Sequence, residues 1–449
     1  MKGINMTSRL WIKLCKLVFI PTVLLIAFFI STLCPKILLA ADKAEKEYIL
    51  IGHPNPSTGP LSEMGEVSPW IDDQFVEKIN AGGGIYIKEY GKKLPIKVKI
   101  VDTESNPTKA IRVATDLILQ DKVDMMVVMH TPDTVNPVTA VCERYEIPCV
   151  STQAPIDPWL SNGPYKWSFH SFWNIDSLAD VYLGIWDINA NQTNKVVGCL
   201  WPGDADGIAF SEVFNKKLPA RGYKYVNYEG FSHGISDFSP AINLFKKENV
   251  EILTGVLIFP DWVNFWRQSI KLGFYPKIVT MAKAILFPSS VNTMVLEGFL
   301  PEGWTTEVWW NQDFPFKYSL IGHDTYDAKG LSENWSKDTG KQPTMVLGFV
   351  HAGFEIAIDA LKRAQTLDKE KLRQAIEDTD LDTIIGHIKF NSENYCLTKL
   401  VGGQWLRGSS WPWELKVIYD PANLTTTKTQ GMFFPMPKTV LPDLKSKAK

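Results

Sequence analysis

Residues 94–129 read "LPIKVKIVDTESNPTKAIRVATDLILQDKVDMMVVM" and contain one strand–helix–strand unit. The beginning of this stretch alternates apolar and polar side chains, which is typical of a strand. Residues 107–120 place their apolar side chains on one helical face. Pro107 suits the first turn of a helix, and Ser105 or Asn106 can cap it. The apolar run at the end predicts a strand covered on both faces, as in parallel sheets.

The same unit recurs along the chain and predicts an α/β protein with two parallel sheets. The first series of strands is expected at 48–53, 96–102, 124–129 and 148–151. The second series is expected at 196–201, 224–229, 252–258 and 277–280. The join between the two series falls near 170–180. A later segment has the period of a helix at 345–364 and strand-like pieces at 384–390 and 414–419.

Three consecutive glycines, Gly82 to Gly84, lie in "EKINAGGGIYIKEYG" (77–91). A phosphate-binding loop requires a strand, then glycines, then a helix N-terminus, so that amide groups face the anion. Here the order is reversed, because the glycines follow an expected helix at 62–80. They therefore indicate the end of a helix, where glycine adopts the left-handed conformation at little cost. A nucleotide site is not favoured.

The N-terminus has the pattern of a secretory signal peptide over residues 1–41. Four basic residues precede the apolar run 17–33, and small residues follow at Ala40 and Ala41. We expect cleavage there, and an uncleaved membrane anchor is the alternative. Removal would shift the net charge from -2 to -7, since this segment holds five basic and no acidic residues. No basic stripe then remains to indicate nucleic-acid binding.

Four cysteines lie beyond this segment: Cys142, Cys149, Cys199 and Cys396. An even number in an exported protein permits disulfides, but buried free thiols are the simpler interpretation. No C-x-x-C motif indicates a zinc ribbon or a redox pair. The proline-containing tail, 426–449, has no clear period and is expected to be surface coil.

Several stretches resemble the type I periplasmic binding proteins, in particular the leucine/isoleucine/valine-binding receptors of ABC transporters. They are "STGPLSEMGE" (57–66), "KINAGGGI" (78–85), "VDTESNPTKAIRVATDLILQDKVDMMVV" (101–128) and "ERYEIPCVS" (143–151). The resemblance implies two Rossmann-like lobes joined by three crossovers, with a ligand cleft between them. It places 48–172 and 313–380 in the first lobe, and 173–312 and 381–425 in the second.

The chain departs from this family where amino-acid binders hold their ligand. Pro132 and Pro155 stand where hydroxyl side chains would hold the ligand carboxylate, with Gln153 near them. The acid that would hold the ammonium group is replaced by Lys283 in "MAKA", and a tyrosine by Asp206 in "DADG". We therefore expect weak binding of leucine, isoleucine and valine. An aromatic or apolar carboxylate is the favoured ligand.

Candidate ligand-binding residues are those at the carboxyl ends of the expected strands, which face a crevice in open parallel sheets. They are Ser57, Met64, His130, Thr131, Asp133, Gln153, Ala154, Trp173, Asp176, Trp201, Asp204, Asp206, Phe259 and Lys283. Trp173, Trp201 and Phe259 would form an aromatic wall. Lys283 or His130 could pair with a ligand carboxylate. Asp204 and Asp206 are also suited to cap the helix that follows them.

No spaced set of residues indicates catalysis, a metal site or a cofactor, since H-E-x-x-H, G-x-S-x-G and phosphate-loop motifs are missing. We therefore expect a non-catalytic periplasmic receptor that acts as a monomer. It would take a small molecule and deliver it to the membrane permease of an ABC importer. A ligand-sensing module of a signalling system is the alternative, and a hydrolase of an aromatic ester or amide is third.

Overall fold

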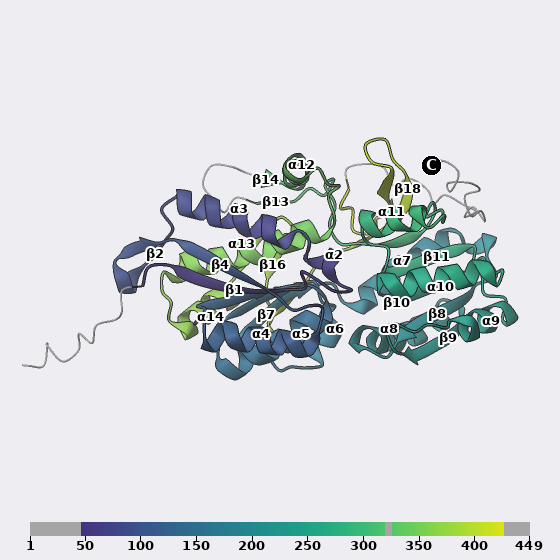
Figure 1. Ribbon diagram of the computed structural model, residues 1–449, viewed down its shortest axis with the longest axis horizontal. Coiled ribbons are helices and arrows are strands. Elements are labelled where there is room, and N and C mark those ends of the chain that lie inside the picture. The colour runs from purple at the N-terminus through teal and green to yellow at the C-terminus, as the bar shows by residue number, and fades with distance from the viewer. Residues whose placement is uncertain (1–45, 319–325, 426–449) are drawn as a thin grey trace, which may run out of the picture. The chain divides into compact units, whose positions relative to one another are not determined.

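The computed structural model describes residues 46–318 and 326–425 (Figure 1). The expected signal peptide and the tail 426–449 lie outside the described residues. Within the described ranges, every helix is too short or too polar to cross a bilayer.

The first sheet is entirely parallel and has the strand order β17-β7-β6-β5-β1-β4. Its strands are β1 (Ile49–Asn55), β4 (Ile96–Asp102), β5 (Met125–Val128), β6 (Cys149–Thr152), β7 (Ser168–Phe172) and β17 (Tyr395–Leu397). The four strands predicted for this sheet are confirmed. We call this sheet and the helices packed on it the first lobe.

The second sheet has the order β19-β18-β12-β11-β10-β8-β9 and is parallel from β9 to β12. Its last two strands run antiparallel to their neighbours. The strands are β8 (Val196–Pro202), β9 (Lys224–Phe231), β10 (Ile252–Leu257), β11 (Ile278–Lys283), β12 (Thr305–Val308), β18 (Val401–Arg407) and β19 (Trp413–Tyr419). This sheet and its helices form the second lobe, so the prediction of two separate sheets is confirmed.

Helices cover both faces of each sheet. On the first, α3 and α13 lie on one face and α4 and α5 on the other (Figure 1). On the second, α7 and α8 pack on one face and α9 and α10 on the other. The helices are α2 (Ser62–Gly65), α3 (Ser68–Ala81), α4 (Pro107–Leu119), α5 (Thr131–Tyr145), α6 (Ile156–Leu160), α7 (Ile175–Ile188), α8 (Ala205–Ala220), α9 (Ser239–Lys247), α10 (Phe259–Lys271), α11 (Pro288–Leu296), α12 (Ala328–Thr339), α13 (Val346–Ala364) and α14 (Lys369–Glu377).

Short elements complete the described chain. They are the 3-10 helices η1 (Lys88–Tyr90) and η2 (Ala190–Gln192) and the strands β2 (Ile85–Ile87), β3 (Lys92–Leu94), β13 (Lys317–Tyr318), β14 (Tyr326–Asp327), β15 (Asp380–Thr383) and β16 (Gly386–Lys389). Each of these strands pairs with one neighbour in a two-stranded antiparallel sheet.

Local sequence signals explain where the helices begin. The side chain of Asn106 accepts a hydrogen bond from the amide of Lys109 at 2.9 Å, which confirms the predicted cap of α4. The single helix predicted at 62–80 is instead two helices, α2 and α3. Pro69 lies in the first turn of α3, where the lack of an N–H group and the fixed φ of proline favour a new start.

The glycines end α3, as predicted. The amide of Gly84 donates to the carbonyl of Ile79 at 2.9 Å. Gly83 and Gly84 have φ of +83° and +89°, in the left-handed region that glycine tolerates, whereas Gly82 has φ of -77°. A Cβ atom on Gly84 would lie 2.1 Å from the carbonyl oxygen of Leu94, so the next segment passes too close for any other residue.

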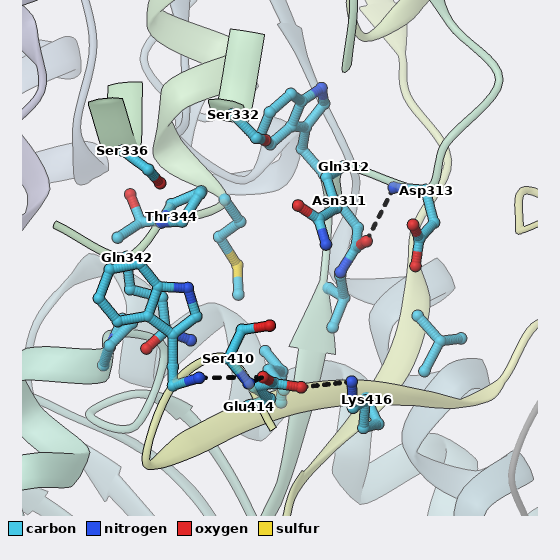
Figure 2. Close-up of a pocket in the computed structure, with 18 of the residues that line it drawn as sticks. Asn311, Gln312, Asp313, Ser332, Ser336, Gln342, Thr344, Ser410, Glu414 and Lys416 are labelled. Atoms are coloured by element: carbon cyan, nitrogen blue, oxygen red, sulfur yellow. Dashed lines mark hydrogen bonds and ion pairs between the residues drawn. The ribbon is translucent and has the colours of Figure 1, made fainter. Parts of the chain in front are cut away.

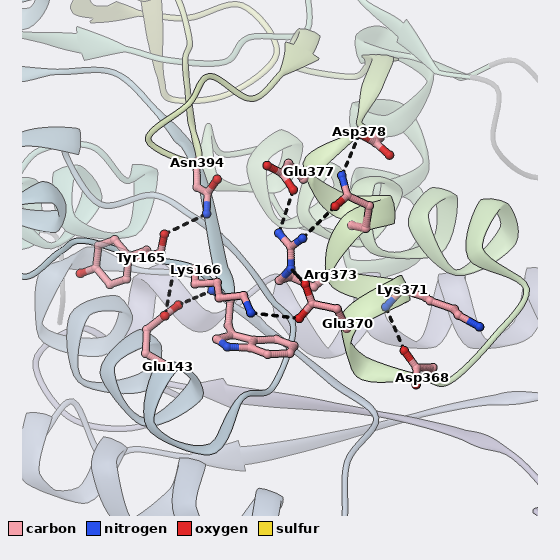
Figure 3. Close-up of polar contacts among 12 residues, drawn as sticks. Glu143, Tyr165, Lys166, Asp368, Glu370, Lys371, Arg373, Glu377, Asp378 and Asn394 are labelled. Atoms are coloured by element: carbon pink, nitrogen blue, oxygen red, sulfur yellow. Dashed lines mark hydrogen bonds and ion pairs between the residues drawn. The ribbon is translucent and has the colours of Figure 1, made fainter.

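The chain passes between the sheets three times, at 173–174, 309–316 and 398–400. The third of these crossovers comes later in the chain than predicted. Residues 381–425 were expected in the second lobe, but β17 pairs with β7 in the first sheet. A polar network holds this returning segment to the first lobe (Figure 3). There Asn394 donates to the carbonyl of Tyr165 at 3.1 Å, and the residue after Tyr165, Lys166, pairs with Glu370 of α14 at 3.1 Å. The remaining division into lobes stays a prediction.

All four cysteines of the described chain are free thiols. Cys142, Cys149 and Cys199 are buried and Cys396 is half-buried. Burial raises the pKa of the Cys199 thiol well above its usual value, so this group remains protonated and packs as a small apolar side chain.

Candidate functional site

A small cavity lies between the two lobes, where the carboxyl ends of the parallel strands meet. Its volume is about 30 Å³, room for about one water molecule. We call it the interlobe cavity. Six of the predicted residues line it: Met64, Thr131, Gln153, Trp173, Asp206 and Lys283. A larger ligand can enter only if the lobes separate or the lining side chains move.

The fold itself brings these residues together. Thr131 begins α5 directly after β5, and Gln153 follows β6, so both project from the first sheet. Asp206 lies in the first turn of α8 after β8, and Lys283 ends β11 in the second sheet. In open α/β sheets, strand ends and helix N-termini face the same crevice, and here the crevices of two sheets face each other.

Four non-glycine residues at these strand ends have left-handed backbones. The φ angles are +78° at His130, +64° at Thr131, +67° at Gln153 and +67° at Lys283. Such conformations cost of order 1–3 kcal/mol each and concentrate at ligand sites, where the surrounding fold enforces them. Thr131 is the most unusual, because a β-branched side chain rarely adopts positive φ.

Lys283 and Asp206 form a buried ion pair in this cavity, with Nζ and Oδ2 2.5 Å apart. Burial alone would lower the pKa of Lys283, but Asp206, Asp204 and Asp133 outweigh burial and raise it. Burial raises the pKa of Asp206 to about 6, and Lys283 only partly offsets that rise. Lys283 therefore stays charged, and its charge is already shared with protein carboxylates.

Asp204 has the helix-capping role predicted for it, and Asp206 does not. Asp204 accepts from the amide of Gly207 at 2.7 Å and contacts His233 at 2.8 Å. The other ring nitrogen of His233 lies 2.8 Å from Asp261. Burial alone would lower the pKa of His233, but these two carboxylates outweigh burial and raise it to about 9. This charged triad fixes the loop next to Asp206.

His130 does not supply the positive charge that we considered from the sequence for pairing with a ligand carboxylate. Burial, and to a smaller extent His53, lower its pKa to about 3, so the ring is neutral. Its Nδ1 lies 3.0 Å from Oε1 of Gln153 and its Nε2 lies 3.1 Å from Oγ of Ser68. Gln153 also donates to the carbonyl of Val346 at 3.3 Å. The role of His130 is therefore to hold Gln153 in place behind the cavity.

Four buried polar atoms around the cavity have no hydrogen-bond partner among the described residues. They are Oγ1 of Thr131, Nε1 of Trp173, Oδ1 of Asp206 and Nε1 of Trp309. Three of these atoms can donate a hydrogen bond, and the carboxylate oxygen accepts one. Buried polar groups are nearly always paired in folded proteins, so these atoms mark where the polar groups of a ligand could bind.

The aromatic wall of the cavity differs from the predicted one. Only Trp173 of the three predicted aromatic residues lines the cavity. Trp201 is buried in the second lobe, with its ring centroid 5.9 Å from that of Phe210. Phe259 packs against the core on the opposite face of the same sheet. The wall also contains residues that were not predicted: Phe172, Phe210, Leu286 and Trp309, with Glu307 beside them.

The remaining predicted residues do not line the cavity. Ser57 is exposed and accepts a hydrogen bond from Asn55 at 2.9 Å. Asp133 is half-buried in the first turn of α5. Ala154 is buried, and its carbonyl lies 2.7 Å from the ring of His170. Asp176 is exposed and pairs with a surface lysine.

One contact joins the lobes at the edge of the cavity. The hydroxyls of Ser289 and Ser290, at the start of α11, both donate to the carboxylate of Glu63 in α2. Met64, the next residue of α2, lines the cavity. Within the described ranges, histidine, cysteine and acidic side chains form no group of three or more that could hold a metal ion.

Sequence comparison finds a family model described as "Periplasmic binding protein" over residues 49–398. An amino acid binding protein of Pseudomonas aeruginosa is 26% identical over 52% of this chain, and the match spans 60% of that protein. A second protein of that organism, described as binding leucine, isoleucine, valine, threonine and alanine, is 21% identical over 77% of this chain and 86% of its own length.

Structural comparison finds the same fold in proteins of low sequence identity. A leucine binding protein of Thermotoga maritima has a TM-score of 0.69 at 18% identity, over 84% of this chain and 100% of that chain. An ABC-transporter solute binding protein of Rhodopseudomonas palustris, in complex with 3,4-dihydroxybenzoic acid, has a TM-score of 0.65 at 18% identity, over 83% and 97%. With the two lobes and their cleft, these matches show that the chain belongs to the type I periplasmic binding proteins of the leucine/isoleucine/valine-binding family.

Proposed function

We propose that this protein is the periplasmic receptor of an ABC importer, which captures a small organic molecule between its lobes and delivers it to a membrane permease. The observation that carries this proposal is the set of four unpartnered polar atoms, which both lobes and two of the crossovers contribute to one cavity. A ligand that contacts both lobes stabilises the closed arrangement through its greater affinity for that arrangement. The family, whose members bind substrates outside the cytoplasm, supports the same role.

The lining favours an aromatic or apolar acid that also carries one hydrogen-bond donor. Thr131, Trp173 and Trp309 offer donors to a carboxylate, and the free oxygen of Asp206 accepts from a hydroxyl. The indole rings and Phe210 supply flat apolar surface for a ring. A hydroxybenzoate has this pattern, and the Rhodopseudomonas relative is bound to a molecule of that class.

The same lining disfavours a standard amino acid. The ammonium group of leucine would have to approach Asp206, whose other oxygen is already 2.5 Å from the ammonium group of Lys283. Two like charges sharing one buried carboxylate repel each other. We therefore propose that leucine, isoleucine and valine bind weakly.

Calorimetric titration of the mature chain with 4-hydroxybenzoate, benzoate and leucine tests this proposal. We expect 4-hydroxybenzoate to bind most tightly, because benzoate leaves Asp206 unpartnered. Trp173→Phe keeps an aromatic ring but removes the indole donor, and should weaken binding about tenfold. Trp201→Phe is the matched control and should leave affinity unchanged. Tight binding of leucine with no response to either aromatic acid would refute the ligand class.

A further inference from the structure

A second and larger cavity lies beside the interlobe cavity. Its volume is about 600 Å³. Its walls are α12, residues 342–345, residues 311–313 and the hairpin of β18 and β19 (Figure 2). We call it the hairpin cavity.

The crossover after β12 separates the two cavities. Trp309 lines the interlobe cavity, whereas its neighbours Val308 and Trp310 line the hairpin cavity. This alternation follows from extended backbone, in which successive side chains point to opposite sides. Leu286 lines both cavities, so the two are neighbours, and residues 308–310 lie between them.

Two buried hydroxyls line the hairpin cavity without a partner. Oγ of Ser332, in α12, and Oγ1 of Thr344 make no hydrogen bond among the described residues. Ser332 is 1% exposed and Thr344 is 9% exposed. A buried hydroxyl without a partner is costly, and both residues belong to one wall of the cavity (Figure 2). Both hydroxyls indicate that a polar molecule completes this wall.

The charges around the cavity exclude an anionic ligand. The acidic side chains are Asp313, Glu333 and Glu414, and the only basic side chain in the lining is Lys416. Lys416 is already paired with Glu414 at 2.5 Å. Glu414 in turn accepts from the amide of Ser410 at 2.9 Å. No cation of the lining is therefore available to a carboxylate or a phosphate.

The other lining groups suit an uncharged molecule that carries several hydroxyls. Asn311, Gln312 and Gln342 present amide side chains, which can both donate and accept. Trp310 and Trp405 donate their indole N–H groups to backbone carbonyls, at 2.9 Å and 2.7 Å, and both are almost fully buried. The half-buried Trp411 is the lining residue that offers ring surface. Ring surface packs well against the C–H groups of a sugar.

We propose that the hairpin cavity is a second binding site, which takes an uncharged, hydroxyl-rich molecule of about the size of a monosaccharide. Its volume lies within the range of small-molecule pockets. Its walls come from α12 on the first lobe, from the hairpin of the second and from the crossover between them. A molecule bound there contacts both lobes, so occupancy shifts the equilibrium between their arrangements and changes affinity at the interlobe cavity.

Saturation-transfer NMR and calorimetry on the mature chain test this site with D-glucose, D-ribose and myo-inositol. At least one of them should bind saturably, and glucuronate, the anionic match to glucose, should not. Ser332→Ala and Thr344→Val remove one hydroxyl each at nearly constant volume. Each should weaken binding about tenfold without lowering the melting temperature, since neither hydroxyl has a protein partner to lose.

Lys283→Met separates this site from the importer function, because Lys283 lines the interlobe cavity and not the hairpin cavity. Sugar binding should survive in Lys283→Met even where binding of the aromatic acid is lost. Saturable binding of none of the three probes would overturn the proposal. Equal binding by the wild type, Ser332→Ala and Thr344→Val would overturn it as well.

Discussion

Replacing Lys283 by methionine should destabilise the protein by leaving Asp206 buried without its counter-ion. The two side chains are 9% and 4% exposed, and removing one member of such a pair typically costs ~3–5 kcal/mol. The unfolding entropy is ~2.1 cal/mol/K per residue, so over the roughly 370 described residues the melting temperature should fall by ~4–6 °C. Differential scanning calorimetry measures this fall directly.

The loss in Lys283→Met should depend on pH. The pKa of Asp206 is already raised to about 6 by burial, and removing the lysine raises it further. An acid whose pKa is higher in the folded state than in the unfolded state contributes stability at low pH and loses it as pH rises. The gap between variant and wild type should therefore widen from pH 5 to pH 8.

Two further variants complete this experiment. Lys283→Met with Asp206→Leu replaces the whole pair by apolar groups and should recover most of the lost stability. Lys224→Met breaks an exposed pair with Glu248 and should cost less than ~1 kcal/mol. The buried ion pair would be refuted if Lys283→Met had the melting temperature of the wild type at both pH values. It would also be refuted if the double variant were no more stable than Lys283→Met.

Burial would lower the pKa of His233, but Asp204 and Asp261 raise it to about 9, so its stabilisation is complete below pH ~6.5 and lost towards pH 9. The melting temperature of the wild type should fall across that range more steeply than that of His233→Asn, and parallel curves would contradict the triad. Gly84→Ala should destabilise by several kcal/mol, because its Cβ would lie 2.1 Å from a backbone oxygen. Gly83→Ala, with φ of +83° and a Cβ atom no nearer than 3.5 Å to the flexible side chain of Lys93, should cost only ~1 kcal/mol. Equal losses in the two variants would contradict this account of the turn.

Much of the fold could be predicted because its signals are local. The alternation of residues 94–102, the cap at Asn106 and the order of helix and glycines each act within one turn or strand. The limit of such signals is visible at β17, which has only three residues. It is too short to show a period, and its place beside β7 depends on the polar contacts of the returning segment.

The candidate site was predictable in position but not in its contacts. Strand ends can be located from the sequence, and Thr131, Gln153 and Lys283 do line the cavity. The pairing of Lys283 with Asp206 joins two βα units that are far apart in the sequence. No local sequence pattern therefore predicts it. Trp201 also ends a strand, but its side chain points into the core of the lobe, because the side to which a strand-end residue points depends on packing.

Mass spectrometry of small molecules released from the mature protein tests the central claim most directly. The wild type and Lys283→Met are expressed in the same rich medium, purified under native conditions and denatured to release whatever they carry. We expect the wild type to release a single small organic acid in near-stoichiometric amount, and the variant to release little or none of it. A molecule carried equally by both proteins, or no bound molecule in a wild type that also fails to bind any organic acid offered to it, would contradict a ligand site at Asp206 and Lys283.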